Sequence, residues 1–314
     1  MNKFSVISVI RVIGFFLLFS IFLQIILGAW VRLTGSGMSC PDWPLCYGML
    51  FPTPDKIRVL DNIEYTYFQI FLEWIHRANA AFIIGPICVM FSFLLIFKKE
   101  INNNYKKYAY FLILFLFIQG ALGGVTVFKS NIPWSVAIHL LFAFLLYLTV
   151  LLIILNTYDI KFENKIYVKK YLKVNTLITG SLVLLTACAG AFTSKYGASL
   201  ACSNWPKCED RLLPNFKDMF QIIHFAHRVM ALSLVIFLSI LLLKLKFYIK
   251  NMTNTIKTIV MLILFIILLQ VAIGALLIYF SVPIWMGIFH QATGLILFTL
   301  ITILYFHIRV KQFS

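Results

Sequence analysis

The chain has 314 residues, of which 61% are hydrophobic and only 12% carry a charge. A soluble domain carries about a quarter charged residues, so this composition argues against a protein built around a large soluble core. The formal net charge of +16 could suggest a nucleic-acid partner, but its placement between apolar runs favours another explanation.

Eight apolar runs are each long enough for a helix to cross a bilayer, which takes about 20 residues. They are approximately residues 9–31, 69–97, 108–128, 134–156, 171–193, 220–244, 257–280 and 284–307. The first run has no obvious small-residue cleavage site and is interpreted as a retained helix, not as a signal peptide. The sequence therefore predicts an all-α polytopic membrane protein with eight transmembrane helices.

Basic residues gather on one predicted side of the membrane. The segments on that side hold 17 Lys and Arg residues against three acidic residues, whereas the opposite side holds 10 basic and eight acidic residues. Lys and Arg accumulate in the cytoplasmic loops of membrane proteins. We therefore expect cytoplasmic termini, a location in a bacterial or archaeal cell membrane, cysteine-containing loops on the outer face, and no nucleic-acid partner.

The two halves of the chain repeat each other. Residues 28–46 match residues 190–208 without a gap, with two cysteines, a Trp-Pro pair and a Gly-Ala pair in the same places. Further along, residues 151 positions apart coincide, and the pairs are His76/His227, Gln119/Gln270, Trp134/Trp285 and His139/His290. The repeat predicts two four-helix bundles, residues 1–160 and 161–314.

Each repeated segment ends with a pair of cysteines, Cys40 and Cys46 in the first half and Cys202 and Cys208 in the second. The predicted topology places both pairs outside the cell, where disulfides persist, so we expect one local disulfide in each loop. A pair that exchanges electrons with an external thiol protein is the alternative to a plain structural disulfide. A metal site is disfavoured because neither loop contains a histidine.

Four histidines lie in the outer halves of the predicted helices: His76, His139, His227 and His290. Within each half, two imidazoles can face each other across the bundle, as a planar macrocycle between two helices requires. Neutral imidazole is a good ligand of haem iron. A hydrogen bond to a neighbouring helix would explain one such histidine, but two repeated pairs predict axial ligands.

Further polar residues accompany these histidines. Glu73 precedes the first histidine by three residues and shares its helix face. A carboxylate at this depth is a functional candidate, with an interfacial residue that reaches water as the alternative. The second half has His224 at the matching place. Arg77 and Arg228 directly follow a predicted ligand histidine and are candidates for pairing with haem propionates.

Together these motifs resemble the haem A synthase family of bacteria and mitochondria. The resemblance covers nearly the whole chain and rests on GSGMSCPDWPLC at 35–46, EWIHR at 73–77, His139, the second cysteine loop, His227 with Arg228, and His290. Members of that family oxidise one methyl substituent of haem O to a formyl group, which gives haem A for terminal oxidases. The resemblance therefore implies an oxidoreductase.

The resemblance also implies roles for individual residues. His76 and His139 would hold the substrate haem O, with Glu73 as the essential acidic residue that accepts a proton or orients water. His227 and His290 would bind a permanent haem b that passes electrons. Successive hydroxylations of the methyl group would give a gem-diol, which loses water to form the aldehyde.

Two features of the resemblance concern the loops and the second unit. Cys40 and Cys46 match cysteines that are implicated in the family's function, whereas Cys202 and Cys208 match a structural disulfide. His224 departs from the family pattern, which leaves open whether His227 is the only ligand on its helix. Candidate partners are the haem O synthase and an external thiol–disulfide protein, and the sequence is compatible with a homo-oligomer.

Two other functions stay open from the sequence alone. A di-haem electron-transfer protein of the cytochrome b kind would hold two equivalent haem b groups and would not need Glu73. A membrane thiol oxidoreductase would work through its cysteine loops without haem. The pigment of the purified protein separates the three possibilities, since it would contain haem b with haem O or haem A, haem b alone, or no haem.

Overall fold

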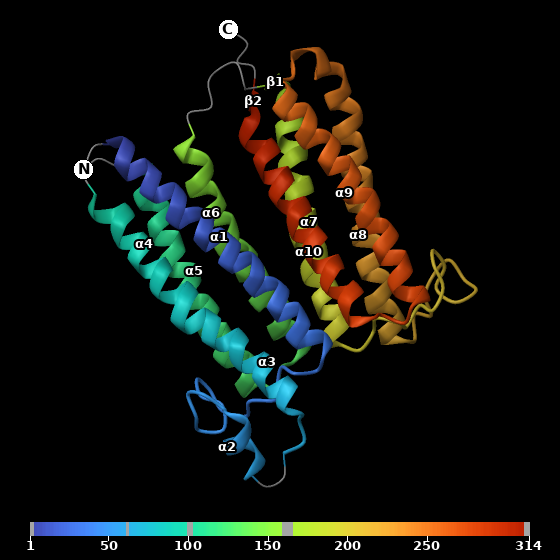
Figure 1. Ribbon diagram of the computed structural model, residues 1–314. Coiled ribbons are helices and arrows are strands. Elements are labelled where there is room, and N and C mark those ends of the chain that lie inside the picture. Colours follow the sequence, from blue (N-terminus) through green and yellow to red (C-terminus); the bar gives the residue numbers. More distant parts are fainter. Residues whose placement is uncertain (1–2, 61–62, 99–102, 159–165, 311–314) are drawn as a thin grey trace. The chain divides into compact units, whose positions relative to one another are not determined.

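The computed structural model describes residues 3–60, 63–98, 103–158 and 166–310 (Figure 1). The described part of the chain contains eight helical spans of 24 to 32 residues that are long and apolar enough to cross a membrane. The predicted all-α fold with eight transmembrane helices is thereby confirmed. The chain divides into two compact units, Met1–Thr157 and Tyr158–Ser314.

The first unit contains four spans and a short surface helix. Its elements are α1 (Lys3–Leu33), α2 (Pro54–Arg58), α3 (Tyr67–Ala78), η1 (Asn79–Ile84), α4 (Gly85–Phe97), α5 (Asn103–Phe128) and α6 (Pro133–Thr157). Helices α3 and α4 belong to one membrane span and are joined by η1, a π-helical stretch. The spans pack in a ring, because α1 contacts both α6 and the α3–α4 span, while α5 contacts α4 and α6.

The second unit has the same ring of four spans. Its elements are β1 (Ile166–Val168), α7 (Lys170–Lys195), α8 (Met219–Leu245), the 3-10 helix η3 (Lys246–Asn251), α9 (Asn254–Tyr279), α10 (Ile284–His307) and β2 (Ile308–Val310). Each helix contacts the next, and α10 returns to α7. Strands β1 and β2 form a short parallel pair. This pair is not predictable from the sequence, because segments of three residues carry no readable periodicity.

The helix that leads into each cysteine loop ends at a glycine. Gly35 follows α1 with φ of 69°, and Gly197 follows α7 with φ of 80°, a region that glycine adopts without steric cost. The backbone N–H of Ser36 donates to Val31 O at 2.9 Å, and the corresponding bond after α7 spans 3.0 Å. These six-to-one bonds are those of a Schellman motif, and they turn the chain out of the helix into the loop.

Side-chain caps fix where the first histidine-bearing helix of each unit begins. Thr66 and Gln69 form a capping box at the start of α3, in which each side chain satisfies a backbone N–H of the other residue. Asp218 caps α8 by accepting from the backbone N–H of Phe220 at 2.9 Å. Each cap thus fixes the start of a helix whose first three turns carry polar residues of the candidate site.

Candidate functional site

Each of the four predicted ligand histidines packs its ring against a glycine on a neighbouring helix of the same unit. The pairs are His76–Gly28, His139–Gly123, His227–Gly190 and His290–Gly274. The approach is closest in the first and third pairs, where a Cβ on the glycine would lie 3.1 Å and 3.0 Å from the ring carbon Cε1. In the other two pairs the same distances are 3.8 Å and 3.5 Å. The missing side chain therefore gives each imidazole room to lie against the helix.

A polar residue lies one turn before each of these glycines. The pairs are Gln24–Gly28, Gln119–Gly123, Thr186–Gly190 and Gln270–Gly274. Residues four apart share a helix face, and the three glutamine amides reach the same imidazole, whereas the hydroxyl of Thr186 is buried without a hydrogen-bond partner among the described residues. The amide nitrogen of Gln24 lies 3.1 Å from His76 Nδ1, and those of Gln119 and Gln270 lie 3.4 Å from Nε2 of their histidines. We call each such pair of residues an imidazole notch.

Each unit contains two notches. In the first unit they seat His76 of α3 and His139 of α6, and in the second they seat His227 of α8 and His290 of α10. On His139, His227 and His290, the Nδ1 atom is buried and has no hydrogen-bond partner among the described residues. A buried polar atom without a partner costs about 1–3 kcal/mol. Paired imidazoles with unsatisfied nitrogens, seated on glycines, fit the axial ligands of a haem iron.

Both predicted disulfides are present. Cys40 bonds to Cys46 in the first unit, and Cys202 bonds to Cys208 in the second. All four cysteines are almost fully buried, and each loop is closed further by an antiparallel bridge from the second cysteine to the residue three positions on. The loops are therefore compact. That the first disulfide exchanges electrons during function stays a prediction.

Arg77 and Arg228 hold the cysteine loops by their backbone carbonyl groups. The acceptors are Cys40, Asp42 and Leu45 for Arg77, and Cys202, Asn204, Pro206 and Lys207 for Arg228. A guanidinium group carries five N–H donors in a fixed plane, which suits several carbonyls at once. The geometry thus gives both arginines a partner within the protein, and their predicted pairing with haem propionates stays a prediction.

Glu73 is buried beneath the first cysteine loop, with 4% of its surface exposed. Its Oε2 accepts the backbone N–H of Cys40 at 2.8 Å and the hydroxyl of Ser39 at 3.1 Å. Its Oε1 forms an ion pair with Arg77 Nη2 at 2.6 Å. The carboxylate therefore joins the loop to the helix that carries His76, and we call Glu73 with Arg77 the carboxylate latch.

His224 occupies the same place beneath the second loop and is 5% exposed. The backbone N–H of Cys202 donates to its Nδ1 at 3.2 Å, and Arg228 Nε donates to its Nε2 at 3.3 Å. A neutral imidazole has only one acceptor nitrogen, so His224 satisfies one of these donors at a time. This imidazole latch, His224 with Arg228, is therefore weaker than the carboxylate latch, which accepts from every donor that faces it.

The first cysteine loop also reaches across to α5. The ring of Trp43 packs on Gly124, where a Cβ would lie 3.7 Å from the indole, and meets Phe128 edge-on at 6.5 Å between ring centroids. Gly124 directly follows the glycine of the His139 notch. In the second unit, Ala275 stands at the matching position. The first loop is thus held on α3 by its latch and on α5 by its tryptophan.

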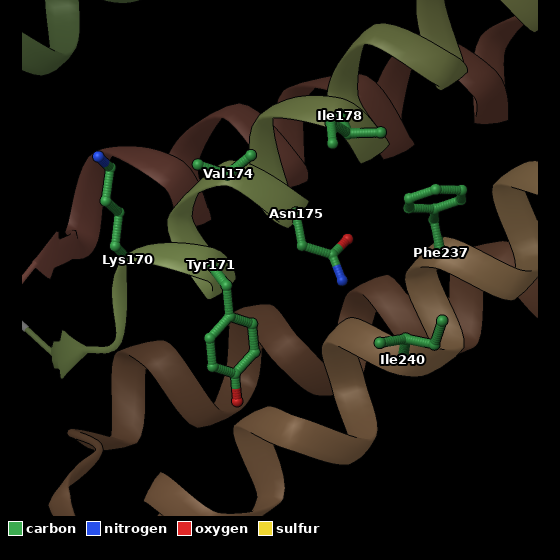
Figure 2. A pocket seen from close by; sticks show the side chains of 7 residues that line it. All are labelled: Lys170, Tyr171, Val174, Asn175, Ile178, Phe237 and Ile240. Atoms are coloured by element: carbon green, nitrogen blue, oxygen red, sulfur yellow. The ribbon is translucent and has the colours of Figure 1, made fainter.

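A shallow groove of about 560 Å³ opens on the second unit, away from the notches (Figure 2). Its lining residues are Lys170, Tyr171, Val174, Asn175 and Ile178 of α7 and Phe237 and Ile240 of α8. Ile178 precedes the notch glycine Gly190 by about 18 Å along α7, at 1.5 Å per residue. No predicted site residue lines this groove, so the candidate functional site is formed by the notches and the loops above them.

The notch residues are candidate functional positions that the sequence alone does not predict. Gly28, Gly190, Gln119 and Gln270 belong to the repeat without a predicted role, and the sequence gives no reason to single out the others, which are Gln24, Gly123, Thr186 and Gly274. The available signal was a glutamine four residues before a glycine, which occurs on three of the four helices that carry a notch. Such a pair inside an apolar run indicates a helix face that offers a polar group next to space left by a missing side chain.

Comparisons with known proteins agree along most of the chain. Residues 11–302 match the family model COX15-CtaA, described as cytochrome oxidase assembly protein. A protein named heme A synthase from Shewanella oneidensis is 28% identical over 90% of this chain and 92% of its own length. Proteins of the same name from Flavobacterium psychrophilum and Staphylococcus epidermidis are 27% and 31% identical, over 89% and 84% of this chain and 92% and 83% of their own lengths.

Proposed function

The chain belongs to the COX15-CtaA family of cytochrome oxidase assembly proteins, and on this premise we propose that it is a haem A synthase. Such an enzyme is an oxidoreductase that converts haem O to haem A by oxidising one methyl group to a formyl group. Within the chain, the proposal rests on one observation, the two imidazole notches of each unit. Opposed imidazoles between helices are a common way for a protein to hold a haem iron.

We assign the substrate to the first unit and the cofactor to the second. His76 and His139 would hold haem O, and His227 and His290 would hold haem b. When bound, haem b would supply a path for electrons that leave the substrate. The assignment is supported by the firmer anchoring of the first loop, because a reaction on a bound substrate benefits from a fixed cover that controls the access of water.

Glu73 is the acidic residue that we assign to the reaction. Oxidation of a methyl group through alcohol and gem-diol stages removes protons as well as electrons from the substrate carbon. A proton taken up at Oε1 would break the ion pair with Arg77, and Arg77 holds three carbonyls of the loop. Proton uptake by Glu73 would therefore loosen the loop in the same step, which links the chemistry to opening of the cover.

The orientation in the membrane is part of the proposal. The distribution of basic residues supports cytoplasmic termini and cysteine loops on the outer face of the cell membrane. Haem O would enter sideways from the bilayer, with its farnesyl tail in lipid. The haem O synthase and an external thiol–disulfide protein are the partners that this arrangement would suit.

Pigment analysis tests the proposal directly. Protein purified from cells that make haem O should contain haem b together with haem O or haem A. Replacement of His76 or His139 by Ala should remove haem O and haem A and leave haem b, whereas replacement of His227 or His290 should remove haem b. The matched control is His307→Ala, at the far end of α10, which should change neither pigment.

Two results would contradict the proposal. Haem b alone, in equal amounts in both units, would indicate an electron-transfer protein that does no chemistry on the porphyrin. The complete absence of haem would indicate that the histidines are structural and that the cysteine loops carry the function.

A further inference from the structure

The first ligand histidine of the first unit faces a hydrogen-bond donor. Gln24 Nε2 lies 3.1 Å from His76 Nδ1, its nearer ring nitrogen, and 3.4 Å from Nε2, and it donates to the backbone O of His76 at 2.8 Å. Asn79 Nδ2 donates to Gln24 Oε1 at 2.7 Å. Together the two bonds fix the amide, since a carbonyl oxygen only accepts and an amide nitrogen only donates. The side chain that meets the His76 ring is therefore an N–H group.

The matching histidine of the second unit meets no such donor at its Nδ1. Thr186 stands where the first unit has Gln24, and Met230 stands where it has Asn79. The Nδ1 atom of His227 is buried and has no hydrogen-bond partner among the described residues. The second histidine of each unit meets a glutamine amide at 3.4 Å in both, so the difference is confined to the first.

The helix itself differs at the same point. Asn79, which locks the Gln24 amide, is the first residue of the π-helical stretch η1, whereas α8 is an α-helix throughout Met219–Leu245. Single π-helical turns inside α-helices are rare and occur frequently at functional sites. The π-helical backbone and the hydrogen bond from Asn79 to Gln24 therefore occur together in the first unit. Neither has a counterpart in the described α8.

The kind of partner decides how strongly an imidazole binds a metal. A ligating histidine usually donates its other N–H to an acceptor, which raises the basicity of the ligating nitrogen, and loss of such a partner lowers metal affinity about 10- to 100-fold. A donor that faces Nδ1 instead favours the tautomer whose proton is on Nε2, so iron binds Nε2 only if this hydrogen bond is given up. His76 should therefore bind iron more weakly than His227.

We propose that Gln24, locked by Asn79, is a positioning residue that keeps His76 an exchangeable iron ligand. The inference rests on the proposed function, in which haem O enters and haem A leaves at every turnover while haem b stays. Release would require both iron–histidine bonds of the first unit to break, and the bond to His76 would be the weaker one. The second unit has no such requirement, and its His227 has no hydrogen-bond donor at Nδ1 among the described residues.

Haem transfer tests this inference on the full-length protein without relying on activity. Protein loaded with haem b and haem O, and kept without an oxidant, is mixed with excess apomyoglobin, and the loss of each pigment is followed by chromatography. Gln24→Thr places the residue of the second unit in the first and should slow haem O loss about 10-fold. Gln24→Met, which keeps the volume and removes the donor, should act in the same direction, and haem b loss should not change.

The reciprocal variant is the matched control. Thr186→Gln should speed haem b loss and leave haem O loss unchanged. Haem O loss at the wild-type rate or faster in both Gln24 variants would overturn the inference, because a side chain that merely packs would loosen the site when replaced. In that event the proposed function still stands if His76→Ala removes haem O. Retention of haem O by His76→Ala would contradict both.

Discussion

The two cysteine loops share a disulfide, a bridge and an arginine, but they are anchored with different strength. Beneath the first loop, a carboxylate accepts from Cys40 N–H, from Ser39 and from Arg77. Beneath the second, one imidazole faces two donors and satisfies one of them. The comparison indicates that the repeat preserves the scaffold and places its chemical differences at the latch and the first histidine.

Exchange of the latch residue Glu73 is expected to have the largest effect on haem A production. Glu73→His gives the first unit the imidazole latch of the second, so the loop stays anchored while the carboxylate is lost. Proton transfer by a positioned group contributes about 10²- to 10⁴-fold, so haem A production should fall at least 100-fold while haem O stays bound. The measurement is the ratio of haem A to haem O in the purified pigment.

The reciprocal variant, His224→Glu, is the control for this exchange. It should leave haem A production unchanged and stabilise the second loop, since a carboxylate satisfies both donors that face it. A haem A yield in Glu73→His within a few-fold of the wild type would assign Glu73 to loop anchoring alone.

The notch glycines offer the next largest effect. In Gly28→Ala the new Cβ would lie 3.1 Å from His76 Cε1, so the ring must shift. Overpacking of this kind costs about 1–3 kcal/mol, which should lower haem O occupancy about 10-fold and leave haem b in place. In Gly190→Ala the new Cβ would lie 3.0 Å from His227 Cε1. This variant should lower haem b occupancy and leave haem O in place. Pigment ratios measure both.

Gly123→Ala is the matched control, because its Cβ would lie 3.8 Å from His139 Cε1, an ordinary contact. It should retain haem O. Equal losses of haem O in Gly28→Ala and Gly123→Ala would mean that the glycines serve helix flexibility and not the close approach of the histidine ring.

The sequence predicts features of single segments, but it does not predict contacts between segments. Apolar runs predict the eight spans because length and hydropathy are properties of single segments. The roles of Gln24 and Gly28 depend on which helix faces which, and a single sequence does not give this. The π-helical stretch η1 is a shift in backbone hydrogen bonding that leaves hydropathy unchanged. Arg77 was predicted to pair with propionates, but the orientation of its guanidinium depends on loop carbonyls that have no signature in sequence.

Replacement of the latch arginines should have a smaller effect, on stability. Arg77→Lys keeps the charge that Glu73 needs but loses the fork that reaches several carbonyls at once. With one or two hydrogen bonds lost, the free energy of unfolding should fall by about 1–2 kcal/mol, seen as a lower midpoint of thermal unfolding. Arg228→Lys should cost less, because much of Arg228's hydrogen bonding is at exposed positions. A larger loss in Arg228→Lys would contradict the ranking of the two latches.

The smallest effect is expected where Trp43 rests on α5. A Cβ in Gly124→Ala would lie 3.6 Å from Phe128 and 3.7 Å from the Trp43 indole, which is normal van der Waals contact. Alanine also favours the helix over glycine by about 0.5–1 kcal/mol, so the variant should be stabilised by that amount, and Ala275→Gly in the second unit should be destabilised equally. If Gly124 instead serves a loop that must lift from α5 during turnover, Gly124→Ala will be more stable and yet slower in forming haem A, and Ala275→Gly will change stability alone.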